Sequence, residues 1–446
     1  MLQSYRHEPE FLSHMADGTI KQINPFTGTE VWTVPGRGNR PLGVAAQNPR
    51  PLDPAQHDAH CAFCAKRYLE TPPEKARLLR RPDGRWDTEY WTAAEHLFDT
   101  VAEFRRVPNL FEILSYDYWH KNYGYELSPR VAEHRAEYLA SEQGRTHVLK
   151  VVEMKLRASG YSQARIDELS FEEKTEFASG FFGGGHDVIV ARRHYVEGAT
   201  DDNQAASSGT LTPEEHHRFT AFTIDSIQAL YATNRYARYV AVFQNWLKPA
   251  GASFDHLHKQ LAAIDERGVQ HEIALQALRQ NPNIFNELAV NYASYKNLVI
   301  AENEHAIMFA GFGHRYPTLE IYSKSERSDP WEQSEEEVRG MSDLLHAAHA
   351  ATGPDVPCNE EWHYRPADVD LGMPWRVMLK WRVSTLAGFE GATRIYLNTI
   401  GPATVRDRVV NKLFSLRAEG RIADNIQIAF EAACRPNPLR YNKIAH

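Results

Sequence analysis

The stretch Ser253-Phe254-Asp255-His256-Leu257-His258-Lys259-Gln260-Leu261 carries the clearest signal in the sequence. Successive side chains of a strand point to opposite faces, so a strand here places His256, His258 and Gln260 on one face and Leu257 and Leu261 on the other. A hydrophobic core does not require two imidazoles and an amide side by side. The pattern therefore favours a metal site, or a catalytic imidazole with a hydrogen-bonding amide, over a polar strand face next to a loop.

Cys61-Ala62-Phe63-Cys64 is the second chemical motif, and its C-x-x-C spacing supplies half of a tetrahedral zinc site. A redox pair has the same spacing, but no thioredoxin-like strand runs into the motif and two prolines follow soon after it. Histidines must complete a zinc site, and the candidates are His57, His60, His194 and His256. His194 lies just past a predicted strand over residues 187–191, from which its side chain can turn toward a metal held by a loop.

Two capping boxes predict two long helices, one in each half of the chain. They are Thr212-Pro213-Glu214-Glu215 and Ser334-Glu335-Glu336-Glu337. Each predicted helix is followed by two predicted strands, and the histidine motif lies on the second strand of the first set. The same order of elements in both halves indicates an internal duplication.

The spacing of the two halves supports this duplication. The separation from Thr212 to His256 equals the separation from Ser334 to Met378. In this alignment Met378 and Lys380 lie opposite the two histidines, so only the first half keeps the pair. Lys380 then offers a positive charge that could meet a substrate phosphate, pair with a carboxylate such as Glu361, or simply be solvated.

We therefore expect an α+β fold of two halves, each an antiparallel sheet with a packed helix, over residues 1–265 and 266–446. The first ~110 residues are rich in Pro and Gly, which predicts short strands and ordered loops. Residues from about 115 to 180 predict a helical insertion of three segments. The run Gly183-Gly184-Gly185 has neither the spacing nor the following Lys of a phosphate-binding loop.

Composition narrows the classes of partner. The chain has 446 residues and a formal net charge of -8, which argues against a general nucleic-acid or anionic-membrane binder. No apolar run approaches the roughly 18 residues that a membrane span needs, and the first residues lack the apolar core of a secretory signal. With only four cysteines a disulfide framework is excluded, and we expect a cytoplasmic protein.

Taken together, these motifs resemble the galactose-1-phosphate uridylyltransferase branch of the histidine triad superfamily, which includes nucleotide-sugar phosphorylases. The resemblance extends over most of the chain, and its segments occur in the family's order. They are Asn24-Pro25-Phe26-Thr27-Gly28 through Pro41, Cys61 to Cys64 with Thr71-Pro72-Pro73-Glu74, Val107-Pro108-Asn109-Leu110-Phe111, His186 to His194, Phe243-Gln244-Asn245, and Gly251 to Gln260.

The resemblance implies a role for each candidate residue. His258 is the nucleophile and Gln260 holds the phosphate. One zinc is bound by Cys61, Cys64, His194 and His256, with His60 as the main rival for the third position. The remaining substrate-binding residues are Arg37, Arg40, Asn109, Asn245 and Ser253.

The implied reaction moves a nucleoside monophosphate between a nucleotide sugar and a sugar 1-phosphate through a covalent nucleotidyl-histidine. Such a transfer divides into two displacements at phosphorus, for which a neutral imidazole is a suitable nucleophile. Two alternatives remain: a nucleotide-sugar or dinucleotide-polyphosphate phosphorylase of the same chemistry that uses inorganic phosphate, and a non-catalytic zinc-containing nucleotide-binding protein. A homodimer is expected from the resemblance alone.

The sequence departs from the family at several places: Ala252 stands where some members have a cysteine, the insertion is longer than expected, and two departures concern the histidine motifs. Leu257 replaces the proline usual between the two histidines. Members with a second, iron-type site use a histidine pair in the second half, where this chain has Met378 and Lys380 and keeps only His363. We therefore expect no iron-type site in the second half.

Overall fold

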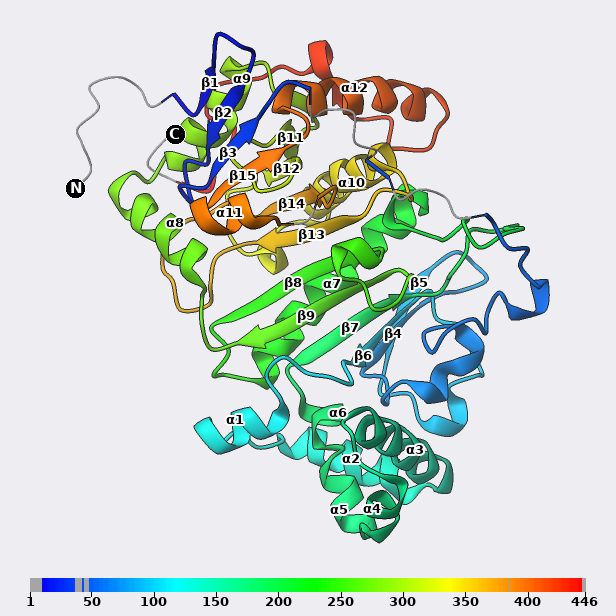
Figure 1. Ribbon diagram of the computed structural model, residues 1–446. Helices are drawn as coiled ribbons and strands as arrows, with labels where there is room; N and C mark the ends of the chain where they lie inside the picture. Colours follow the sequence, from blue (N-terminus) through cyan, green and yellow to red (C-terminus); the bar gives the residue numbers. More distant parts are fainter. Residues whose placement is uncertain (1–9, 37–41, 44–47, 385, 443–446) are drawn as a thin grey trace.

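A large antiparallel sheet forms the centre of the protein in the computed structural model, which describes residues 10–36, 42–43, 48–384 and 386–442 (Figure 1). The sheet has 12 strands. In chain order they are β4 (Ala76–Arg80), β5 (Trp86–Tyr90), β6 (Phe104–Pro108), β7 (His186–Ala191), β8 (Tyr239–Trp246), β9 (His258–Ile264), β10 (Val299–Glu302), β11 (Ala306–Ala310), β12 (Thr318–Ser323), β13 (Cys358–His363), β14 (Arg376–Trp381) and β16 (Gln427–Ile428).

The order of strands across the sheet reflects the duplication. β8 and β13 pair at the centre; outward from β8 come β9, β7, β6, β4 and β5, and outward from β13 come β14, β12, β11, β10 and β16. Apart from the outermost strands β5 and β16, the strands of the two halves follow the chain in the same order, so each half repeats one antiparallel unit. The expectation of an α+β fold built from two such halves is confirmed. A division of the chain at residues 265 and 266 stays a prediction.

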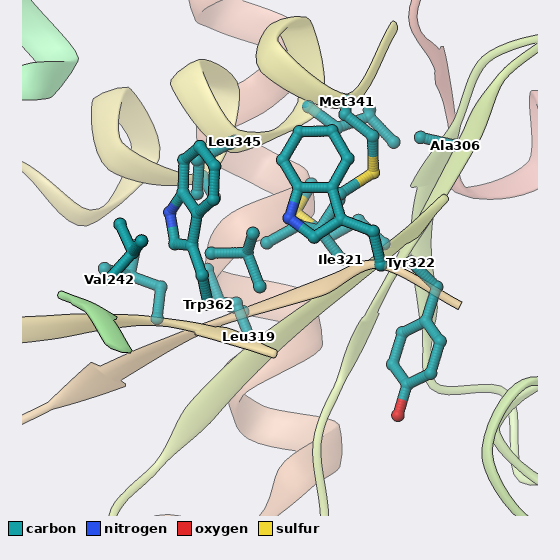
Figure 2. Close-up of a cluster of buried hydrophobic side chains, with 14 of the residues drawn as sticks. Val242, Ala306, Leu319, Ile321, Tyr322, Met341, Leu345 and Trp362 are labelled. Carbon is teal, nitrogen blue, oxygen red and sulfur yellow. The ribbon is translucent and has the colours of Figure 1, made fainter. Parts of the chain in front are cut away.

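One face of the sheet is covered by long helices. α7 (Pro213–Thr233) and α10 (Glu335–Thr352) both begin at the predicted capping boxes. The side chains of Thr212 and Ser334 each accept a hydrogen bond from the backbone N–H of the glutamate three residues on, and that glutamate side chain accepts one from the backbone N–H of the cap residue. They pack on each other and on the sheet, and α12 (Pro402–Ala418) packs beside α10. Figure 2 shows the resulting core, where Met341 and Leu345 of α10 meet Trp362, Leu319 and Ile321 of the strands.

The other face is partly open, and this difference is visible in the strand sequences. In β8 the even-numbered residues are buried under the helices, whereas Ala241, Phe243 and Asn245 are half-buried on the open face. On the second half this open face is covered by a small sheet of order β1-β2-β3-β15 and by one helix. These elements are β1 (Leu12–His14), β2 (Ile20–Ile23), β3 (Glu30–Thr33), β15 (Ile395–Asn398) and α8 (Val269–Gln280).

A helical insertion lies at the far end of the first half (Figure 1). Its position agrees with the prediction, but it contains six helices where three segments were predicted. They are α1 (Tyr116–Tyr123), α2 (Pro129–Ala140), α3 (Glu142–Ala158), α4 (Gln163–Glu168), α5 (Phe171–Glu176) and α6 (Ser179–Gly183). The physical reason is that a serine caps the start of five of them, at positions 115, 128, 141, 162 and 170, so the chain begins a new helix at each serine.

Two short helices complete the second half: α9 (Tyr292–Tyr295) and α11 (Gly388–Thr393). Within the described ranges, no helix combines the length and the apolar character that a membrane crossing requires.

Candidate active site and metal centre

Four side chains from three separate segments converge at the edge of the open face. Cys61 and Cys64 lie in the loop before the turn Ala65–Glu70, His194 follows β7, and His256 immediately precedes β9. The sulfur of Cys61 lies 3.8 Å from that of Cys64 and 3.4 Å from Nδ1 of each histidine. The Cys64 sulfur lies 3.7 and 3.8 Å from the same two nitrogens.

These distances fit a tetrahedral metal ion. With Zn–S and Zn–N bonds of about 2.3 and 2.05 Å, a tetrahedron places two sulfurs about 3.8 Å apart and a sulfur and a nitrogen about 3.6 Å apart. His256 also donates from Nε2 to the carbonyl of Ala191 at 2.6 Å, which leaves Nδ1 unprotonated toward the cysteines. A hydrogen bond from Cys61 lowers the pKa of the Cys64 thiol, which favours a thiolate ligand. The group therefore could hold a metal ion.

His60, the rival ligand, lies outside this group. Its ring centroid is 4.6 Å from that of His194, and the residue is exposed. His194 is buried and presents its Nδ1 to both cysteine sulfurs. The structure thus brings together Cys61, Cys64, His194 and His256.

His258 opens β9 two residues after His256, so the strand begins later than the sequence pattern predicts. Its Nδ1 donates to the backbone carbonyl of His256 at 2.6 Å, which leaves Nε2 with its lone pair free. The residue is 5% exposed, and burial lowers its pKa to about 4, so the imidazole is neutral at pH 7. Phe63 packs on it with ring centroids 5.3 Å apart. Phe63, which lies between Cys61 and Cys64, therefore helps to hold the ring of His258 in place.

Gln260 is held by two donors. Its Oε1 accepts from Nδ2 of Asn109 at 3.2 Å and from Nε2 of His186 at 3.1 Å. His186 has its Nε2 proton fixed because its Nδ1 accepts from the backbone N–H of Ile113. With its oxygen occupied, Gln260 keeps its amide NH2 group available to a phosphate oxygen.

The structure places the remaining predicted residues in different ways. Asn245 accepts a 2.7 Å hydrogen bond from Asn359, and the register of β8 with β9 continues to put it beside His258. Ser253 lies exposed in the loop before His256. Arg37 and Arg40 lie outside the described residues. A cavity of about 530 Å³ lies over β8 and β13, with Phe243 and Asn245 in its lining.

Sequence reasoning assigned no role to His186 or Phe63. The sequence did contain a signal for His186. Residues 186, 188 and 190 alternate along β7 and therefore share one face, and Val190 and Val188 pair with His258 and Gln260, so His186 lies on the face of the histidine motif. No pattern in the sequence marked Phe63 beyond its place inside the C-x-x-C motif.

The fold, and the segment that carries His256, His258 and Gln260, agree with the resemblance to the galactose-1-phosphate uridylyltransferase branch of the histidine triad superfamily. More narrowly, the family model described as "Domain of unknown function (DUF4921)" matches residues 15–441, and the chain belongs to this family.

Comparison with characterised proteins agrees with the class. The chain is 25% identical over 390 residues to an ADP-glucose phosphorylase of Arabidopsis thaliana, covering 86% of this chain and 90% of the relative. A crystal structure of an Arabidopsis thaliana ADP-glucose phosphorylase with bound ADP-glucose matches 88% of this chain and 98% of its own, with a TM-score of 0.55 and 19% identity. The X-ray structure of a GalT-like protein from Arabidopsis thaliana matches with a TM-score of 0.54 and 18% sequence identity. The match covers 88% of this chain and 98% of that chain.

Proposed function

We propose that the protein transfers a nucleoside monophosphate from a nucleotide sugar, with His258 as the nucleophile. The observation that carries this proposal is the tautomer of His258: its Nδ1 proton is held by the His256 carbonyl, so the free Nε2 lone pair can attack phosphorus. Gln260, locked through its oxygen by Asn109 and His186, supplies a fixed donor for the charge that develops on the α-phosphate.

The reaction consists of two displacements. Nε2 of His258 attacks the α-phosphorus; the new P–N bond forms as the bond to the bridging oxygen breaks, and sugar 1-phosphate leaves with that electron pair. An oxygen of the acceptor phosphate then attacks the same phosphorus and the P–N bond breaks, which returns His258 to its neutral form. The cavity over β8 and β13 provides space beside Asn245 for part of the substrate.

The acceptor distinguishes two versions of this chemistry. With a sugar 1-phosphate the product is a new nucleotide sugar, and with inorganic phosphate it is a nucleoside diphosphate. Similarity over 390 residues to a protein named ADP-glucose phosphorylase favours inorganic phosphate. We therefore give phosphorolysis of an ADP-sugar as the first activity to assay and hexose-1-phosphate exchange as the second.

We propose zinc as the ion held by Cys61, Cys64, His194 and His256, because two thiolates and two imidazoles suit it. Four protein ligands close its coordination shell, so its contribution when bound is structural. His256 then fixes the backbone carbonyl that orients His258.

The test compares His258 variants on a panel of nucleotide sugars with and without phosphate. His258→Ala is expected to lose at least a thousandfold in kcat, whereas His96→Asn, an exposed histidine far from the motif, should match the wild type. His258→Gly given a nucleoside 5′-phosphorimidazolide should regain transfer to phosphate, since the reagent replaces the missing intermediate. Near-native turnover by His258→Ala would refute the mechanism. Nucleotide binding without turnover by the wild type would favour the non-catalytic alternative.

A further inference from the structure

A second cavity lies over β14, at the place in the second half that corresponds to the histidine strand of the first half. Its volume is about 350 Å³, within the range of small-molecule sites. Alternate residues of β14 form its floor, namely Arg376, Met378, Lys380 and the following Arg382. The small sheet and α8 enclose it through Phe26, Thr29, Tyr396 and His271. We call it the β14 pocket.

The charge of the β14 pocket is strongly positive. Arg315, Arg376, Lys380 and Arg382 line it, and among the described lining residues Glu361 is the one carboxylate. Lys380 donates to Glu361 at 2.5 Å, so this pair is neutral overall. Three guanidinium groups remain, and they carry charge without a facing acid in the lining.

Arg376 is the most unusual of these groups. It is 4% exposed, and neither its Nε nor its Nη1 has a hydrogen-bond partner. Its guanidinium packs on the ring of Phe285, whose centroid lies 4.7 Å from the guanidinium carbon. The charge of Arg376 lowers the pKa of the buried Glu320, but the Glu320 oxygens accept their hydrogen bonds from His314 and Tyr322. Buried N–H groups of a guanidinium without acceptors are costly, so the retention of Arg376 points to an acceptor that is not part of the chain.

Other polar atoms around the pocket share this lack of partners. Nε of Arg382 and of Arg315, the hydroxyl of Tyr316 and Nε2 of His363 are all buried without a hydrogen bond. Buried polar groups in native proteins are nearly always paired, so several unpaired groups around one cavity indicate a polar ligand. Their charge and geometry suit a dianion, because guanidinium groups hold phosphate through paired hydrogen bonds.

We propose that the β14 pocket is a second ligand site, which binds the phosphoryl group of a small phosphorylated molecule or inorganic phosphate itself. The buried guanidinium of Arg376 is its anchor, with Arg382 and Arg315 completing the cradle. The positive side chains thus stand where relatives with a second metal site would need neutral imidazoles.

The floor of the β14 pocket lies away from His258, although the pocket shares lining residues with the cavity over β8 and β13, namely His271, Asn359, Glu361, His363 and Arg382. The strand register places His258, Asn245, Asn359 and Lys380 in one row across β9, β8, β13 and β14. Three strand spacings amount to about 14 Å, too far for a phosphorus under attack by His258 to touch the floor of the β14 pocket. Hydrogen bonds do link the two regions, from Arg382 to Asn359 and from Asn359 to Asn245.

Calorimetric titration tests the proposal. Inorganic phosphate, glucose 1-phosphate and acetate are each titrated into the wild type, Arg376→Met and His258→Asn. Arg376→Met should weaken phosphate or glucose 1-phosphate binding at least tenfold, the usual loss for a charged hydrogen-bonding group. His258→Asn should keep the Arg376-dependent binding, so this outcome is independent of the transfer mechanism. Tighter binding of glucose 1-phosphate would identify an ester as the ligand, and equal binding would identify phosphate.

Two controls keep the result interpretable. Arg238→Met removes an arginine whose side chain is 56% exposed and should bind as the wild type does. If Arg376→Met does not fold, Arg382→Gln, at the half-buried rim, should show a loss of several-fold. Three results would overturn the proposal. The wild type binds neither phosphate nor glucose 1-phosphate, Arg376→Met binds them as tightly as the wild type does, or acetate binds equally well.

Discussion

At the scale of single residues, the site depends on which ring nitrogen of each histidine carries a proton. Backbone carbonyls decide this for two of them. The Ala191 carbonyl accepts a hydrogen bond from Nε2–H of His256, and the His256 carbonyl accepts one from Nδ1–H of His258. Neighbouring histidines on one segment thereby expose different nitrogens, one toward the cysteines and one as a free base. The same side-chain type therefore suits two chemical tasks.

His186 provides a test of how Gln260 is oriented. His186→Phe keeps a ring in the buried site but removes the donor to Gln260 Oε1, so we expect kcat to fall about tenfold with unchanged metal content. His186→Gln should recover much of the rate, because its amide can donate the same hydrogen bond. A kcat for His186→Phe equal to that of the wild type would mean that Asn109 alone orients Gln260.

The sequence pointed to the side chains that the structure brings together more fully than to the side chains that contact them. Cys61, Cys64, His256 and His258 belong to short motifs whose spacing is set by metal geometry and by strand alternation. His186 and Phe63 act through contacts between segments far apart in the chain, and such contacts leave no local pattern. The predicted roles of all the site residues, in catalysis, substrate binding and metal binding, stay predictions.

At the scale of elements, the Cys–His group connects a loop to the ends of two strands that already pair with each other. The Cys61–Cys64 loop, the end of β7 and the start of β9 meet at one point. We expect about one zinc per purified chain by elemental analysis. Cys61→Ser should lose the metal and lower the melting temperature by several degrees, because metal binding contributes directly to folding stability.

Cys434→Ser is the matched control for the metal experiment, since Cys434 is a free cysteine outside the group. It should keep both zinc and melting temperature. Wild-type protein that contains no zinc after purification without chelators would contradict the assignment, and so would Cys61→Ser protein with full metal content.

Helix starts were more predictable than helix numbers or sheet partners. The capping boxes at Thr212 and Ser334 are local hydrogen-bond patterns, and α7 and α10 begin where they predict. In the insertion, repeated serine caps divided predicted segments into shorter helices. The parallel pairing of β3 with β15 joins residues 30–33 to residues 395–398, a long-range choice that no local pattern encodes.

At the scale of the whole molecule, a buried ion pair joins the two halves of the sheet. Lys259 of β9 lies 2.5 Å from Glu360 of β13, with side-chain exposures of 0% and 1%. His349 of α10 and the indole N–H of Trp362 also bond to Glu360. Although burial opposes its ionisation, the charge of Lys259 and the bond from His349 lower the pKa of Glu360 to about 2.

Removing one member of this pair should be costly. Glu360→Ala leaves the Lys259 charge buried and unpaired, so we expect a loss of about 3–5 kcal/mol in the free energy of unfolding. The double variant Lys259→Met/Glu360→Leu should recover most of this loss, because it removes both charges and keeps the volume. Urea unfolding of the three proteins measures the effect. A Glu360→Ala protein as stable as the wild type would show that the pair does not stabilise the joint between halves.

Our central claim is that His258 becomes nucleotidylated, and one measurement tests it directly. ADP-glucose labelled at the α-phosphorus is mixed with enzyme in the absence of phosphate, and the intact chain and its peptides are analysed by mass spectrometry. We expect release of one glucose 1-phosphate per active chain and an added nucleotidyl mass on His258, which is lost when phosphate is added. The covalent mechanism would be contradicted if the enzyme turned over with phosphate while the rapidly quenched chain never carried the nucleotidyl group on His258.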